Sequence, residues 1–465
     1  MTPLSVFVAL CVACAISACA PKKPVIIETP VIIDAPVAVT IDPDVAATAR
    51  RAGPSPSKTY WEGMRNLDPD YTKRHPVSTE ESRFAEALRL VLSGNVSDAE
   101  LVLDSLRINT PDSLVRMASW VMLSAMLQYQ DKWDILAEIA PKRTDLPPGT
   151  ERNRAAVEEW AAILGKVPKR VVEIPTRPSK AGLTLSMAGT PVISVMLNGK
   201  QRFFWLDTGA SISIVSSDVA ADAGMTPLSH DTLEIVTATG RIPALPSLIS
   251  NLQFAGVTIR NAKAMIVGVE LMQVRDVDVK GPPIAVRIDG IVGFDILNLL
   301  RVRFDYSTGT VTVSQPATPP RSKSRTQRTF FWIGTPMVRL VTSRGVPLNF
   351  VLDTGAQETY ATEMLAIKTG VRTRPGERRS VRGLAGEQRF RGRFIGDIRL
   401  WLGPQRLDFE RLLIFAPQLS SFGTIDGMLG SDIMRTGIVT LDAKNGLFTI
   451  EQPPGPTLRL REEED

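Results

Sequence analysis

Two aspartates with the same neighbours are the residues of this sequence whose types and spacing could carry out chemistry. Asp207 and Asp353 each follow a short apolar run, and each begins the sequence Asp-Thr-Gly-Ala. An apolar run before an aspartate predicts a buried strand that opens into a tight turn, and glycine permits the backbone angles of that turn. Two carboxylates held face to face do not both ionise readily, so they share a proton. Such a pair offers a base to activate water and an acid for a carbonyl oxygen.

The two aspartates lie in stretches of sequence that repeat in register. In both copies a glycine follows the aspartate after 17 residues and another after 33. Gly-Thr-Pro precedes the aspartate by 18 residues in one copy and by 19 in the other. Later in both copies come Ile-Asp-Gly, two apolar residues and a further glycine. Two copies of this length indicate an internal duplication rather than a solenoid.

Each copy resembles a lobe of a retropepsin-type aspartic peptidase. Asp-Thr-Gly-Ala is similar to the catalytic loop of that family, and residues 291–293 (Ile-Val-Gly) and 428–430 (Met-Leu-Gly) are similar to its later apolar-apolar-glycine motif. The resemblance covers about residues 180–315 and 328–453. It implies an all-β acid-protease fold of two lobes with the cleft between them. In that family an active site needs two lobes, from a homodimer or from one chain. The short segment between the copies favours pairing within one chain, and pairing between chains is the alternative.

The resemblance also implies roles for particular residues. Asp207 and Asp353 would be the catalytic pair, and hairpins around Gly240 and Gly386 would be the flaps. Threonine and glycine would brace and bring together the two loops, because the hydroxyl can tie one loop to the other and glycine allows close approach. Neither flap contains tyrosine, which favours the retropepsin side of the family over the pepsin-like side. The loop-bracing candidates are Thr208, Gly209, Thr354 and Gly355.

Composition excludes several other classes of protein. The length of 465 residues predicts about three domains, and an apolar content of 44% is that of a globular protein. A net charge of +5 gives no reason to expect nucleic acid as a partner. His75 and His230 are the only histidines, which leaves little material for a serine triad or a zinc site, so we expect no metal and no cofactor.

The N-terminus predicts export. Residues 1–19 form a short apolar run that ends in small residues, and the end resembles a bacterial lipoprotein box with Cys19 as the lipidated residue. The alternative is a plain signal peptide or an uncleaved anchor. The three cysteines all lie in this segment, so a mature chain would hold no disulfide. Ala20 after the cysteine favours the outer membrane, with the protein lipid-anchored in the cell envelope and facing the periplasm.

We therefore predict a multidomain α+β protein, in which an N-terminal α-helical module of the helical-hairpin or TPR-like kind precedes the bilobed β fold. The helical module could be a packing platform or could bind a substrate or a protein partner. The predicted boundaries are a signal peptide at 1–19, a Pro-rich tether at 20–60, the helical module at 61–165, a linker at 166–180, lobe 1 at 181–316, a linker at 317–328, lobe 2 at 329–453 and a tail at 454–465.

Helix starts are predicted by capping boxes at Ser78 with Glu81 and at Ser97 with Glu100. A buried helix is expected from about 112 to 129, where most faces are apolar, and another from about 151 to 164. In lobe 1, Asn198-Gly199 predicts a hairpin turn. The recurring carboxylates of the later motif are expected to be structural rather than catalytic; they are Asp289, Asp295, Asp426 and Asp432.

Two differences between the copies bear on function. The first copy has nine more residues near 270–287, which we interpret as a neutral surface insertion, with a loop that overhangs the cleft as the alternative. The flap region of the second copy, residues 368–393, holds nine Lys and Arg but only two Glu. A solvated basic face is the ordinary interpretation, and a lid that attracts acidic peptides or anionic envelope polymers is the other.

These patterns predict a single-chain aspartic endopeptidase that acts on peptide or protein substrates of the envelope or periplasm. The alternative from another class is a non-catalytic envelope scaffold with a degenerate peptidase fold.

Overall fold

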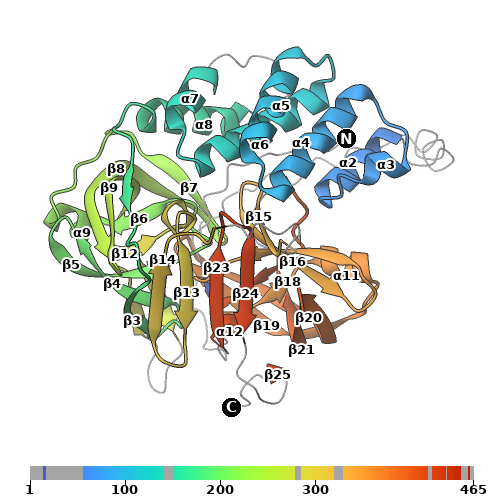
Figure 1. Ribbon diagram of the computed structural model, residues 1–465. Helices are drawn as coiled ribbons and strands as arrows, with labels where there is room; N and C mark the ends of the chain where they lie inside the picture. The colour runs from blue at the N-terminus through green and yellow to red at the C-terminus, as the bar shows by residue number, and fades with distance from the viewer. Residues whose placement is uncertain are drawn as a thin grey trace, which may run out of the picture.

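The structure is a computed structural model that describes residues 14–16, 56–140, 151–277, 284–318, 328–416, 422–435, 437–451 and 459–460. Helices make up the N-terminal part and strands most of the remainder (Figure 1). Cys19, most of the predicted signal peptide and nearly all of the predicted tether lie outside the described residues. Among the helices described, none combines the length and apolar character needed to cross a membrane.

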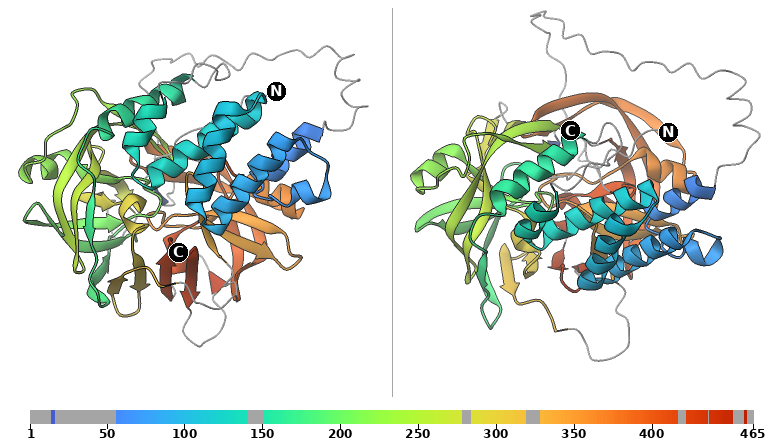
Figure 2. Two further views of the ribbon diagram at one scale, coloured as in Figure 1. Left: turned by 45° about the horizontal axis from the view of Figure 1, so that its top comes forward. Right: turned by 90° about the horizontal axis from the view of Figure 1, so that it is seen from above.

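The helical module forms a layer over one side of the β region, and two further views show that it lies against both halves of that region (Figure 2). Its successive helices pack on one another, α4 on α5, α5 on α6 and α7 on α8. The helices are α2 (Pro56–Arg65), α3 (Tyr71–Arg74), α4 (Thr79–Ser93), α5 (Val96–Asn109), α6 (Ser113–Tyr129), α7 (Trp133–Ile139) and α8 (Glu151–Leu164).

One of the two predicted capping boxes is confirmed. The Ser78 hydroxyl accepts a hydrogen bond from the Glu81 N–H (3.1 Å), and the Glu81 carboxylate accepts one from the Ser78 N–H (2.9 Å). The second box is wrong. Gly94 ends α4 in the left-handed conformation, and α5 already begins at Val96, which places Ser97 inside its first turn. A two-residue turn between the helices leaves no room for a cap at Ser97.

The strands fall into two lobes of similar order. Lobe 1 contains β2 (Val171–Glu173), β3 (Ser179–Leu185), β4 (Pro191–Leu197), β5 (Lys200–Leu206), β6 (Ser213–Ser216), β7 (Leu233–Thr237), β8 (Gly240–Phe254), β9 (Val257–Val267), β10 (Gln273–Val277), β11 (Ile284–Arg287), β12 (Gly290–Val292), β13 (Arg301–Asp305) and β14 (Thr310–Ser314), with helices α9 (Ser217–Asp222) and α10 (Phe294–Leu297). Lobe 2 contains β15 (Phe330–Trp332), β16 (Pro336–Thr342), β17 (Pro347–Leu352), β18 (Tyr360–Ala361), β19 (Thr373–Gly383), β20 (Gly386–Leu402), β21 (Gln405–Ile414), β22 (Gly427–Leu429), β23 (Ile438–Asp442) and β24 (Leu447–Glu451), with helices α11 (Glu363–Thr369) and α12 (Ser431–Met434).

In both lobes the strand that leads into Asp-Thr-Gly-Ala pairs in parallel with the strand of the later glycine motif, β5 with β12 and β17 with β22. The glycine that begins this later strand allows the pairing to be close. A Cβ on Gly290 would lie 2.3 Å from the Phe204 ring, and one on Gly427 would lie 2.3 Å from the Phe350 ring. The repeated Ile-Asp-Gly therefore reflects the aromatic ring that packs over each glycine.

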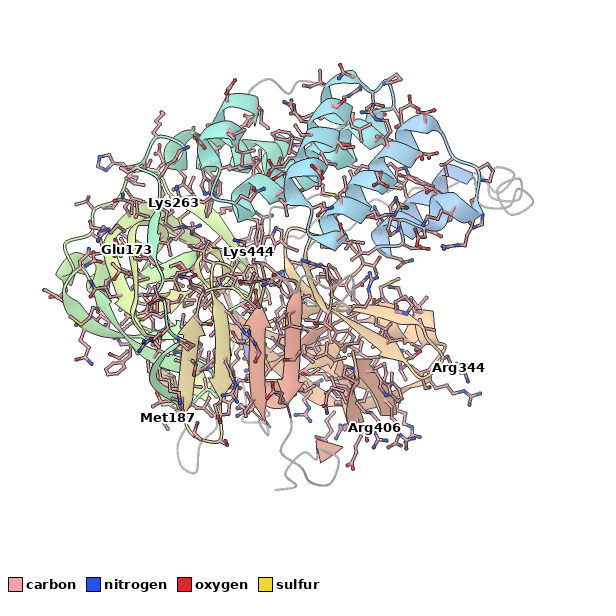
Figure 3. The ribbon with its side chains drawn as sticks, viewed as in Figure 1. Glu173, Met187, Lys263, Arg344, Arg406 and Lys444 are labelled. Carbon is pink, nitrogen blue, oxygen red and sulfur yellow. The ribbon has the colours of Figure 1, made fainter. Side chains whose placement is uncertain are left out.

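The lobes are joined to one another and to the helices by several contacts. Strand β13 of lobe 1 pairs with β23 of lobe 2, so that one sheet runs through both lobes. The ring of Tyr129, at the end of α6, stacks on Trp332 of lobe 2 (5.0 Å between centroids) and on Phe294 of lobe 1 (6.0 Å). After α6, Asp131 forms an ion pair with the buried Lys263 of β9 (2.8 Å), which Figure 3 labels beside the helical layer.

Three segments predicted to be irregular contain regular structure. The predicted tether ends in α2, because Tyr60 is an aromatic residue that buries almost completely there. Within the predicted linker 166–180, β2 pairs with the edge of β9, and lobe 1 already begins with β3 at Ser179. In the predicted tail, β25 (Arg459–Leu460) pairs with β21. Near the other end of the chain, β1 (Cys14–Ile16) pairs with β19.

The nine-residue insertion of lobe 1 is more than a neutral surface loop. Its described residues form the hairpin β10–β11, and β10 lies beside β19, a flap strand of lobe 2. Met272 and Val274 bury their side chains at the base of this hairpin. The insertion therefore reaches the opposite lobe.

Candidate active site

Asp207 and Asp353 occupy the same position in the two lobes. Each follows the last residue of its strand, β5 or β17, and each side chain is buried. The Asp207 carboxylate accepts hydrogen bonds from the N–H groups of Gly209 (2.8 Å) and Ala210 (3.3 Å). Asp353 accepts the equivalent pair from Gly355 (2.9 Å) and Ala356 (3.0 Å). The turn that follows each strand thus holds its carboxylate with backbone donors.

Thr208 and Thr354 tie the two turns together reciprocally. The Thr208 hydroxyl accepts a hydrogen bond from the Thr354 N–H (3.0 Å) and donates one to the Leu352 carbonyl (2.9 Å). The Thr354 hydroxyl accepts from the Thr208 N–H (2.9 Å) and donates to the Leu206 carbonyl (2.7 Å). All four bonds are buried and cross between the lobes. They fix the position of one turn against the other.

This bracing brings the two carboxyl groups into contact. The side chain of Asp353 lies within hydrogen-bonding range of Asp207. Gly209 lies directly against the Asp353 carboxyl group, and a Cβ there would be 2.6 Å from Asp353 Cγ. No side chain can be added at that position without displacing the carboxyl group. The predicted pair and its predicted bracing residues therefore lie together in the structure.

Burial governs the ionisation of the pair. Desolvation raises the pKa of Asp353 to about 6, although the N–H groups of Ala356 and Gly355 and the neighbouring Asp207 favour its charged form. A carboxyl group that retains its proton at mildly acidic pH can donate it to a substrate carbonyl. Its ionised neighbour can accept a proton from water.

A second layer of hydroxyl and carboxylate groups supports each turn. In lobe 1 the Ser213 hydroxyl accepts a hydrogen bond from the Gly293 N–H (3.0 Å) and donates one to Asp295 (2.9 Å). In lobe 2 the Thr359 hydroxyl accepts from the Gly430 N–H (2.9 Å) and donates to Asp432 (2.7 Å). Ser213 and Thr359 were not singled out from the sequence. The signal that could have found them is a hydroxyl residue six positions after each aspartate.

The recurring carboxylates of the later motif have structural contacts, as expected. Asp426 accepts a hydrogen bond from the Asn349 N–H (2.7 Å) and pairs with Lys368 (2.7 Å). Desolvation raises the pKa of Asp295 to about 7, with Arg170 and the Ser213 hydroxyl opposing the shift. None of these contacts joins them to the central pair.

Gly240 and Gly386 lie at the turns of the hairpins β7–β8 and β19–β20, both with positive φ (157° and 110°). The two hairpin tips meet, because the Gln388 side chain donates a hydrogen bond to the Thr239 carbonyl (3.2 Å). A Cβ on Gly240 would lie 3.1 Å from Ala385 Cβ. The structure thus brings both predicted flaps to one place.

The flap of lobe 2 carries arginines that face one another. Arg378 and Arg391 are directly opposed across β19 and β20, and both are exposed. Nearby, Glu387 pairs with Arg382 (3.1 Å) and with Arg389 (2.8 Å). The flap of lobe 1 differs, since its Arg241 is paired with Glu234 (2.8 Å) on the facing strand.

Comparison with known proteins agrees with this geometry. Residues 193–298 match a family profile described as "gag-polyprotein putative aspartyl protease", and residues 340–433 match one described as "Aspartyl protease". A crystal structure of a retropepsin-like aspartic protease from Rickettsia conorii is similar at 17% sequence identity, over 32% of this chain and 97% of that chain, with a TM-score of 0.21. Among curated proteins, none matches the sequence. Each matched family segment contains one of the two central aspartates, so the two profile matches support an aspartyl protease-like domain in each lobe.

Proposed function

We propose that this protein is an aspartic endopeptidase whose single active site is built from both lobes of one chain. The observation that carries this proposal is the reciprocal bonding of Thr208 and Thr354, which holds Asp207 and Asp353 in contact within the same chain. Burying two carboxyl groups against each other costs free energy of folding. The fold has no structural reason to bring two aspartates face to face, so the arrangement favours a catalytic function. Hydrolysis of an amide uses both members.

In the proposed reaction the pair holds one proton and one water molecule. The ionised carboxylate takes a proton from the water as its oxygen attacks the peptide carbonyl carbon, and the protonated carboxyl group donates its proton to the carbonyl oxygen. Collapse of the resulting gem-diol breaks the C–N bond, while one proton passes from the pair to the leaving nitrogen and a hydroxyl of the diol returns a proton to the pair. The products are a carboxylic acid and an amine, and no covalent enzyme intermediate forms. The raised pKa of Asp353 supports it as the carrier of the shared proton.

Peptide or protein substrates in the envelope or periplasm are part of the proposal. An extended chain already pairs with the edge of β19, where Cys14–Ile16 adds as an antiparallel strand. Addition of a strand to a sheet edge is a common way to bind peptides. Cleavage of the predicted signal peptide would remove this segment, and lipidation of Cys19 would anchor the protein at the outer membrane, facing the periplasm. The helical module, of the helical-hairpin or TPR-like kind, would offer a surface for a protein partner.

The test is digestion of a diverse peptide mixture between pH 4 and pH 8, with cut sites read by mass spectrometry. Wild-type protein is compared with Asp207→Asn and Asp353→Asn, which keep the shape of each side chain and remove its ionisation. Each variant should lose activity by about 10²–10⁴-fold, the usual contribution of an acid–base group. Asp397→Asn is the matched control, because Asp397 is exposed within β20 at a positive φ (49°) that asparagine also tolerates.

Cleavage by wild type and by the Asp397→Asn control, with none by either dyad variant, supports the proposal. If the mixture stays intact with wild-type protein at every pH, the proposal is wrong and the scaffold alternative gains. If a dyad variant cleaves as well as the control, some other group carries out the hydrolysis.

A further inference from the structure

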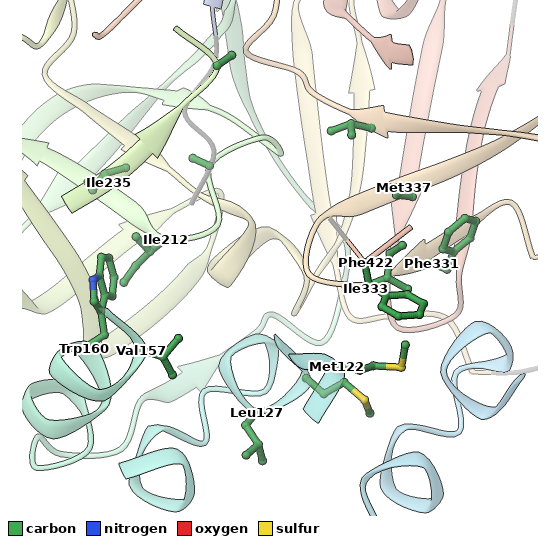
Figure 4. Close-up of a cluster of buried hydrophobic side chains, with 14 of the residues drawn as sticks. Met122, Leu127, Val157, Trp160, Ile212, Ile235, Phe331, Ile333, Met337 and Phe422 are labelled. Atoms are coloured by element: carbon green, nitrogen blue, oxygen red, sulfur yellow. The ribbon is translucent and has the colours of Figure 1, made fainter. Parts of the chain in front are cut away.

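The helical layer breaks the pseudo-twofold relation between the two lobes at the active site. Ile212 and Glu358 are equivalent positions, each five residues after its aspartate. Ile212 is buried, and Figure 4 shows it beside Trp160 and Val157 of α8. Glu358 is half-exposed. The loop after one aspartate is therefore apolar and covered by a helix, while the loop after the other is acidic and reached by water.

The two flap strands have different neighbours. Helix α8 lies along β7, the first flap strand of lobe 1, and Ile235 of that strand is fully buried in the same apolar cluster as Trp160. The equivalent strand of lobe 2 is β19. Its neighbour from the other lobe is β10, a strand of the lobe 1 insertion, and Val381, the residue equivalent to Ile235, is buried without any described helix lying along the strand as α8 lies along β7.

The segment before β22 in lobe 2 is also covered by helices. The Phe422 ring packs against Phe84 of α4 (5.5 Å between centroids). A Cβ on Gly423 would lie 3.1 Å from the Leu67 side chain, and the Thr424 N–H donates a hydrogen bond to the Arg65 carbonyl at the end of α2 (2.7 Å). The equivalent segment of lobe 1 is the hairpin β10–β11, which lies beside β19.

The covered elements thus form one group and their counterparts another. Helices cover the loop after Asp207, the strand β7 and the segment before β22. In the described part of the chain, β19 contacts β10 of the hairpin β10–β11, and the loop after Asp353 is the counterpart of the covered loop after Asp207. Because a twofold relation exchanges the two approaches to the aspartate pair, these groups lie on opposite approaches.

We infer that the helical module closes one of the two approaches to the aspartate pair, so that the peptidase cuts its substrate close to a chain end. This inference rests on the proposed function and specifies its substrate class. A peptide enters past Glu358 and β19, and only a short segment beyond the scissile bond fits toward Ile212 and α8. Substrates that continue for many residues on that side are excluded, whereas long continuation on the other side is accepted.

A peptide series tests the consequence for specificity. One cleaved peptide is extended by ten neutral residues at its N-terminus, at its C-terminus, or at both ends. One of the two single extensions should lower kcat/KM by about a hundredfold, the usual effect of misplacing a substrate, while the other leaves it nearly unchanged. Equal kcat/KM for both single extensions would overturn the inference without touching the proposed function.

A second experiment needs no catalysis. The chain from Ala20 to Asp465 contains no cysteine, so a single introduced cysteine can be labelled without background. Ile212→Cys and Glu358→Cys probe the two equivalent positions with a maleimide under native conditions. Ile212→Cys should react about a hundredfold more slowly than Glu358→Cys, because it requires local opening under α8. Adding Trp160→Ala should speed labelling at position 212 and leave position 358 unchanged.

Equal labelling rates at the two positions overturn the inference, whether or not the protein cleaves peptides. If Ile212→Cys does not fold, amide hydrogen exchange in the unaltered chain decides the question. Slower exchange in residues 207–213 than in residues 353–359 supports a covered approach, and equal exchange contradicts it.

Discussion

Asp207 and Asp353 each accept hydrogen bonds from two backbone N–H groups. The pKa of Asp353 is nevertheless raised to about 6, because desolvation raises it more than these donors lower it. Water that reached the pair freely would remove the shift. The balance between burial and hydrogen bonding at these two residues therefore sets the protonation state of the pair.

The pH dependence of hydrolysis follows from that raised pKa. The pair is active with one proton, and Asp353 loses its proton as the pH rises through about 6. We expect kcat/KM to be high between pH 4 and pH 6 and to fall about tenfold for each further pH unit above the pKa. Initial rates on one cleaved peptide between pH 4 and pH 8 give the profile. A rate that stays constant up to pH 8 would contradict the shared proton.

Each bracing threonine should contribute measurably to stability. Thr208→Val or Thr354→Val keeps the shape of the side chain but leaves a buried N–H and a buried carbonyl without their partner. The free energy of unfolding should fall by about 1–3 kcal/mol, measured by urea denaturation. Thr→Ser at the same positions keeps the hydroxyl and serves as control. A Val variant as stable as its Ser counterpart would show that the hydroxyl bonds do not hold the two turns together.

At the level of single residues, the sequence was sufficient to predict the aspartate pair and its bracing. The repeated Asp-Thr-Gly-Ala sequence indicated Asp207 and Asp353. The hydrogen-bonding capacity of threonine and the small size of glycine indicated that the two residues after each aspartate brace the pair. Ser213 and Thr359 were missed because a hydroxyl residue in a loop has many ordinary uses, and only the structure places them between a glycine N–H and a carboxylate.

The elements that could be predicted are those whose conformation is determined by residues close together in the sequence. The Asn198-Gly199 turn joins β4 to β5 with positive φ at both residues, as its sequence predicts. The strand β2 was missed because its three residues gain their order from the edge of β9, more than 80 residues away. The insertion hairpin likewise depends on a flap strand of the other lobe. No local pattern encodes such partners.

The helical layer is held on lobe 1 by a buried ion pair that a single substitution can test. Asp131→Asn retains the shape and the left-handed backbone (φ 61°) but removes the carboxylate that pairs with Lys263, whose side chain is 6% exposed. We expect a loss of about 1.5–3 kcal/mol in the free energy of unfolding, with faster hydrogen exchange at the end of α6 and in β9.

Asp134→Asn is the matched control, because Asp134 pairs with the exposed Lys169 on the same part of the module. Exposed ion pairs contribute little, so this variant should stay within about 0.5 kcal/mol of wild type. Equal losses in both variants would mean that the Asp131 pair does not anchor the helices.

On the scale of the whole molecule, the two lobes depend on each other and on the helices. The pairing of β13 with β23 extends one sheet through both lobes, and Tyr129 stacks on an aromatic ring from each. The two lobes of one chain are thereby in direct contact. This arrangement could not be predicted from the sequence beyond the short segment between the copies, because Tyr129 and Trp332 are about 200 residues apart.

The most direct test is the rate of peptide cleavage by wild type, by Asp207→Asn, by Asp353→Asn and by an equimolar mixture of the two variants, with the mass of each in solution. A site built from both lobes of one chain predicts active monomeric wild type, two inactive variants and an inactive mixture. Activity that returns on mixing would show that lobes pair between chains. Activity in either variant alone would contradict the dyad of Asp207 and Asp353.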